Sequence, residues 1–222
     1  MPENPTITLS GRLSFPKFTA QEAYDSSLKG KYPDKSVGEA KPNFQLVLDQ
    51  SQLDKLVTFL QDEFLPFIGA RIKAGEKKNV FAKADLDDIL AGLASSTWES
   101  KLYQLPIKDI NEKTAEMAPE GVASISIKGR AGGRIEQKAI VQDEAEVVNP
   151  DYVYTNPVIL PINDTVHEMY AGCNVKVTVN FYAYTGAKPG ISAGASTVVF
   201  HRDNSPFSGG LAVDEDAMFM DD

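Results

Sequence analysis

The stretch "GCNVKVTVNFYAYTG", residues 172–186, restricts the possible folds of this chain more than any other segment. Its apolar residues fall on alternate positions, which is the period of a β-strand with one buried face. That face reads Val175, Val177, Val179, Phe181 and Ala183. The opposite face carries Lys176, Thr178, Asn180, Tyr182 and Tyr184. Two tyrosines in line with a lysine predict either a ligand-binding surface or a face covered by a helix with both hydroxyls satisfied.

The remaining patterns predict a mostly β protein of the α+β class. Alternation and β-rich composition indicate further strands near residues 6–18, 98–105, 122–130, 138–148 and 196–202. Apolar residues at helical spacing predict a helix from Ser51, its expected N-cap, past Pro66 to about Lys73. A shorter helix is expected from Asp85 to Leu93.

This order of elements favours an OB-fold-like Greek-key β-barrel with an N-terminal helical insertion over about residues 50–95. A β-sandwich fits the same strand count nearly as well. Residues 1–213 are expected to form one domain, followed by a disordered acidic tail over residues 214–222.

Charge separates this tail from the rest of the chain. The net charge is −9, but the last nine residues, "DEDAMFMDD", hold five acids and no base, so residues 1–213 carry only −4. A mildly acidic body can still present a basic groove. The Met-Phe-Met centre of the tail favours docking to a partner over a merely solubilising role. The predicted docking residues are Asp214, Glu215, Asp216, Met218, Phe219, Asp221 and Asp222.

Catalytic chemistry is hard to find in the sequence. His167 and His201 sit in no metal-binding motif, and Cys173 beside the strand fits a small buried hydrophobe better than a nucleophile. We therefore expect no enzyme activity, metal or cofactor. No apolar run is long enough to span a bilayer and no signal peptide is evident, so we expect a cytoplasmic protein.

Binding chemistry is easier to support. The segment "SISIKGRAGGR" places cations on one strand face and beyond a glycine turn, although an ordinary solvated hairpin would look similar. The later segment "GAKPGISAGASTVVFHRD" adds a small-residue loop and a basic strand end. Cations for phosphates and rings for unstacked bases are what a single-stranded nucleic acid requires. The candidate residues are Lys128, Arg130, Arg134, Lys176, Tyr182, Tyr184, Lys188, Phe200 and Arg202.

These segments resemble a known family. The order "YAGCNVKVTVNFYAY", then "KPGISAGASTVVFHRDNSPFSGG", then an acidic end containing an aromatic residue, is similar to phage-encoded single-stranded DNA-binding proteins. The resemblance implies an OB fold and sequence-tolerant binding of single-stranded DNA during phage replication or recombination. It also implies that the acidic tail competes with DNA and recruits replication or recombination proteins.

Two other functions, and the question of a homodimer, remain open at this point. A β-rich phage structural or assembly protein would explain the strands and the tail but not the line of Tyr and Lys. An enzyme of nucleic-acid metabolism would need carboxylates that converge from separate segments. A homodimer is possible because exposed strand edges can pair.

Overall fold

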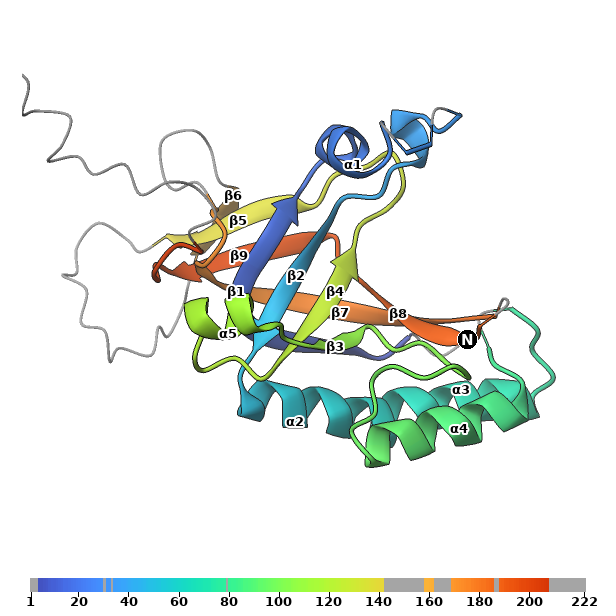
Figure 1. The fold of residues 1–222 in the computed structure, drawn as a ribbon. Helices are drawn as coiled ribbons and strands as arrows, with labels where there is room; N and C mark the ends of the chain where they lie inside the picture. Colours follow the sequence, from blue (N-terminus) through green and yellow to red (C-terminus); the bar gives the residue numbers. More distant parts are fainter. Residues whose placement is uncertain are drawn as a thin grey trace, which may run out of the picture.

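The computed structural model describes residues 4–29, 31–32, 34–78, 80–141, 158–161, 169–185 and 188–207. Strands dominate these residues (Figure 1). They are β1 Thr6–Lys17, β2 Asn43–Leu48, β3 Ile107–Asp109, β4 Ala123–Lys128, β5 Glu136–Val141, β6 Val158–Pro161, β7 Asn174–Tyr184, β8 Gly190–Gly194 and β9 Thr197–Arg202. The helices are α1 Ala20–Ser27, the short 3₁₀ turn Val37–Glu39, α2 Gln50–Phe59, the π-helical turn Leu60–Phe64, α3 Leu65–Lys73, α4 Lys83–Ala94 and α5 Glu112–Met117.

Five strands close into a barrel in the order β1-β2-β4-β8-β7, with β7 pairing back onto β1. All neighbours in this ring are antiparallel except β4 and β8, which run parallel. A closed five-stranded Greek-key barrel of this kind is the OB fold. The expected barrel is therefore confirmed, and the alternative of a β-sandwich is wrong.

After the turn that follows β7, the extended segment from Gly190 to Arg202 contributes to two parts of the sheet. Its first part, β8, pairs with the C-terminal half of β7 and then with β4, which closes the barrel. Its second part, β9, pairs with the N-terminal half of β7 and then with β5, which pairs with β6. The sheet therefore opens between β4 and β5, directly after Gly194.

Helices α2, α3 and α4 gather on one side of the barrel strands, and α1 lies on the other (Figure 1). The rings of Phe59 and Phe64 each lie 5.7 Å, centroid to centroid, from the ring of Phe181 on β7. These contacts join the helices to the barrel interior in one apolar core. A buried phenylalanine or leucine in such a core contributes about 1.5–3 kcal/mol.

The helix expected from Ser51 to Lys73 is present, with two differences. Asp49 is the N-cap, since its side chain accepts a hydrogen bond from the Gln52 amide at 2.8 Å; the expectation of a Ser51 cap is wrong. Directly before Pro66 the helix is interrupted by the π turn Leu60–Phe64. Proline lacks an amide hydrogen and crowds the carbonyl one turn earlier, so a wider turn accommodates it.

Other expectations fail because pairing depends on distant partners. The strand expected near residues 98–105 is mostly irregular and contains only isolated bridges at Glu99 and Gln104. Strands β2 and β8 lie in segments that local composition did not predict as strands. Most of the strand expected at 138–148, the tail and His167 lie outside the described residues. The division at residue 213 stays a prediction.

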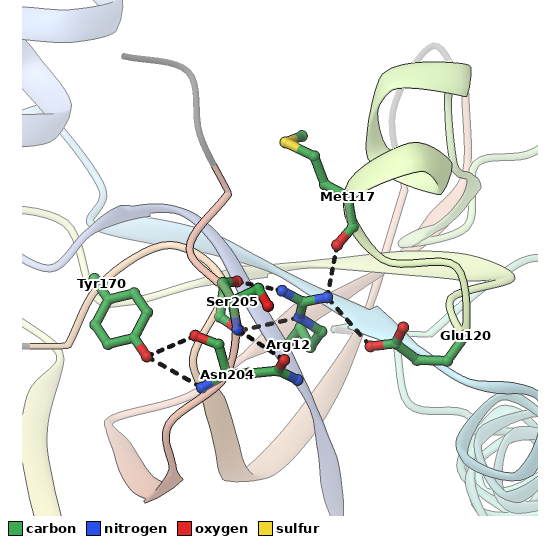
Figure 2. Close-up of polar contacts among 7 residues, drawn as sticks. Arg12, Met117, Glu120, Tyr170, Asn204 and Ser205 are labelled. Carbon is green, nitrogen blue, oxygen red and sulfur yellow. Dashed lines mark hydrogen bonds and ion pairs between the residues drawn. The ribbon is translucent and has the colours of Figure 1, made fainter. Parts of the chain in front are cut away.

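A buried arginine joins three segments at the N-terminal end of β7 (Figure 2). Arg12 on β1 is only 4% exposed. Its guanidinium donates to the Gly172 carbonyl at 3.0 Å, to the Met117 carbonyl at 2.7 Å and to the Ser205 carbonyl. Glu120 lies 3.4 Å away as a partly exposed counter-ion. A buried cation with this many acceptors is satisfied, whereas one without them would be costly.

The same network holds the segment that follows β9. The Arg12 guanidinium carbon lies 4.4 Å from the centre of the Phe207 ring, and the Phe207 amide donates to the Ala171 carbonyl at 2.9 Å. Gly172 has φ +111°, and a Cβ there would lie 2.5 Å from the Ser205 carbonyl oxygen. Only glycine suits both the backbone and this close approach.

We expect Arg12→Met to destabilise the fold by roughly 3 kcal/mol, because it leaves buried carbonyls without donors. Arg12→Lys should recover little of this loss, since one ammonium group cannot reach all three carbonyls. Urea unfolding of the three proteins measures the difference. An Arg12→Lys variant as stable as the native chain would contradict the assigned role of the planar guanidinium.

Candidate nucleic-acid interface

A groove of about 1110 Å³ lies where the sheet opens between β4 and β5. Its floor is the outer face of β1 and β7, including Thr6, Thr8, Thr178 and Asn180. Its walls include residues 194–197, where β8 passes into β9, and residues 128–131, at the end of β4 and in the loop after it. Five cations line it, and we call this surface the cationic groove: Lys41, Lys128, Arg130, Arg134 and Lys176.

The charge of the cationic groove is not neutralised within the described part of the chain. Among the described residues that line it there is no carboxylate. None of its five cations forms an ion pair with a described acid; the described ion pairs are on other residues. Like charges held along a concave surface focus a positive potential into it. The groove therefore suits a polyanion although the whole chain is acidic.

Tyr182 supplies the aromatic surface of the groove. Tyr182 is 44% exposed, one of the few large apolar residues in the described ranges that is exposed to this extent. A Cβ at residue 194 would lie 2.9 Å from Cε2 of the Tyr182 ring, so the ring rests on the bare backbone of Gly194. The Asn180 amide donates to the Tyr182 hydroxyl and holds the other end of the ring. One ring face is thereby supported while the rest of the ring meets solvent.

The structure brings together five of the nine predicted site residues and separates the other four. Lys128, Arg130, Arg134, Lys176 and Tyr182 all line the cationic groove. Two predicted cations lie elsewhere: Arg202 is opposite Asn174 at the end of β9, and Lys188 lines a different hollow.

The two other predicted aromatic residues also lie outside the groove. Tyr184 is half-buried, burial raises the pKa of its hydroxyl, and that hydroxyl donates to Gln104 Oε1 at 3.2 Å. Phe200 is only 7% exposed and belongs to the core, because it falls on the inward face of β9. The expectation that Phe200 offers a ring to bases is therefore wrong.

Lys41, Thr6 and Thr8 also line the groove, although they are not among the nine predicted site residues. Lys41 is the residue before Pro42 at the end of a long irregular connection, and only the pairing of Asn43 with Lys128 brings it near the groove. The two threonines had a signal that could have been used. In the sequence they alternate with Ile7 and Leu9, which predicts an outward strand face. In the structure they pair directly with Asn180 and Thr178 on β7.

His201 lies on β9, in the field of Lys176 and Arg202, and is not among the described residues that line the cationic groove. Burial lowers the pKa of its imidazole, and the charges of Lys176 and Arg202 lower that pKa further. Its Nδ1 is buried with no hydrogen-bond partner among the described residues. His201 is thus held neutral, and it adds no positive charge to the groove at neutral pH.

We expect His201 to make the fold less stable as the pH falls below about 6.5, because the unfolded chain takes up a proton that the folded chain resists. The drop in melting temperature between pH 7.5 and pH 5.5 should be smaller in H201Q than in the native chain. H167Q, which removes the other imidazole of the chain, is the matched control. An unchanged drop in H201Q would argue against a depressed pKa.

Two further observations bear on chemistry. Cys173 is fully buried, and burial raises the pKa of its thiol, as fits a packing residue. Within the described ranges, no three His, Cys, Asp or Glu side chains gather as a metal site. No described helix is both long and apolar enough to cross a bilayer.

An OB barrel with a cationic groove and an exposed ring defines the class of oligonucleotide-binding proteins. A family model described as "Enterobacter phage Enc34, ssDNA-binding protein" matches residues 104–222, which is more than half of the chain. The chain belongs to this family of phage single-stranded DNA-binding proteins. None of the curated proteins matches it.

Three solved structures also align with this chain. The single-stranded DNA-binding protein from bacteriophage Enc34 aligns at 19% identity over 96% of this chain and 89% of that chain, with a TM-score of 0.48. The same protein in complex with ssDNA aligns at 19% identity over 91% and 89%, with a TM-score of 0.48. The single-stranded DNA-binding protein gp2.5 of bacteriophage T7 aligns at 10% identity over 93% and 96%, again at 0.48.

Proposed function

We propose that this protein binds single-stranded DNA without strong sequence preference and serves phage DNA replication or recombination as a non-enzymatic binding protein. The observation that supports this most is the meeting, in one groove, of five cations that form no ion pair with a described acid and one supported, exposed ring. The cations pair with phosphates, and Tyr182 stacks on a base, which any base sequence allows. Family membership supports the same function.

The tail from Asp214 to Asp222 regulates this binding in our proposal: it competes with DNA for the cationic groove and recruits replication or recombination proteins. Support comes from its charge and from where the chain before it is fixed. Phe207 is held beside Arg12 and Ala171, at the N-terminal end of β7. Lys176 is four residues from Gly172, about 13 Å along a strand. The seven residues from Phe207 to Asp214 can extend up to about 24 Å, enough to bring acids to the groove.

Tyr182→Ala should weaken binding of oligo(dT) by about 1–3 kcal/mol without changing the fold, because the lost contact is a stacked base. Tyr182→Phe keeps the ring and should retain most of the affinity. Tyr32→Ala removes another exposed tyrosine, one that lies outside the groove, and is the control. Fluorescence anisotropy with labelled oligo(dT) and thermal melts of each variant test this. A folded Tyr182→Ala protein with unchanged affinity would contradict the stacking role.

Salt titration of binding tests the tail and the function together. At about 50 mM salt the chain truncated after Val213 should bind single strands more tightly than residues 1–222. The difference should shrink at about 200 mM, because salt screens the attraction between tail and groove. Both proteins should prefer single strands to duplex. Equal affinities at low salt would contradict the proposal that the tail competes with DNA. No binding by either protein would contradict the proposed function.

A further inference from the structure

A second basic hollow lies beyond the cationic groove along the same strand. We call it the lysine pocket: it has a volume of about 400 Å³ and is lined by the loop from Trp98 to Leu105, by Lys108 and by Lys188. Among the described residues that line it, the cations are Lys101, Lys108 and Lys188, and the acid is Glu99. None of the three lysines forms an ion pair with a carboxylate in the described ranges. The pocket therefore carries a net positive charge.

The outer face of β7 connects the two sites. Lys176, Thr178, Asn180 and Tyr182 line the cationic groove, and Tyr184 is the next outward residue after them. The Tyr184 hydroxyl donates to Gln104 Oε1, and Gln104 lines the lysine pocket. From Lys176 to Tyr184 the strand covers about 26 Å. A ligand that follows this face from Lys176 past Tyr182 arrives at the lysine pocket.

The wall of the lysine pocket is fixed to the barrel. The Gln104 amide donates to the Pro189 carbonyl, and the Ile191 amide donates to the Gln104 carbonyl, each at 2.9 Å. At Gly190 a Cβ would lie 2.4 Å from the Gln104 carbonyl oxygen, so the loop lies directly against β8. Lys101 lies in the loop that these hydrogen bonds hold against β8, and Lys108 is on β3, which pairs with β4.

We propose that the lysine pocket is a second phosphate-binding site. A single strand of DNA enters it after it has crossed Tyr182 and Tyr184. The inference rests on the proposed function, since it extends the path of the same single-stranded DNA. In this proposal Lys101, Lys108 and Lys188 bind DNA phosphates, and only strands of DNA that are long enough to reach the pocket have phosphates there. The outward face of β7 that carries Lys176, Tyr182 and Tyr184 then forms one continuous DNA path with cations at both ends.

Binding to an oligo(dT) series of increasing length tests the second site. K101Q/K108Q should leave affinity for the shortest bound strands unchanged and should weaken binding progressively as strands lengthen. For the longest strands the slope of log K against log salt should fall by about 1.4, which is 0.7 for each lost phosphate contact. K77Q/K113Q removes two exposed lysines outside both hollows and is the charge-matched control.

Trp98, the single tryptophan of the chain, lines the lysine pocket and offers a second measurement. Its emission should change only with strands long enough to reach the pocket, and this change should be lost in K101Q/K108Q. If the native chain binds DNA but the two double variants behave alike at every length, the second site is overturned and the proposed function stands. If the native chain binds no single strands, both are overturned.

Discussion

Pairing of β7 with three strands is the constraint on which the rest of the structure depends. One edge of β7 pairs with β1, and the other pairs first with β9 and then with β8. Because β8 continues to β4 while β9 continues to β5, the sheet must open beside the outer face of β7. That opening is the cationic groove, so the same hydrogen bonds that close the barrel create the candidate binding surface.

A buried cation stabilises the end of this arrangement. Arg12 is a charged residue of β1, and its side chain is buried because three segments far apart in the sequence cover it (Figure 2). Tyr170 adds to the same region, since its hydroxyl accepts from the Asn204 amide at 3.1 Å. The chain therefore leaves the barrel at a defined place, and our proposal for the acidic tail depends on that place.

The local pattern predicted some of the site well and some of it wrongly. Alternation identified β7 and its outward residues, because the period of a strand follows from backbone geometry alone. It could not separate Tyr182, which is exposed on Gly194, from Tyr184, which is half-buried against Gln104. It also failed at Phe200, where a basic neighbourhood in the sequence suggested a ligand surface but the ring points into the core. In each case the deciding partner is a residue on another segment.

By itself the sequence determined a strand-rich fold, an early helical segment, an acidic end and the strand face that carries Lys176 and Tyr182. These are local properties: periodicity, composition and charge. Only the tertiary structure decided that Lys41, Lys128, Arg130, Arg134 and Lys176 converge while Arg202 and Lys188 do not. Convergence depends on strand order and on where β8 and β9 diverge, and both are fixed by hydrogen bonds between residues distant along the chain.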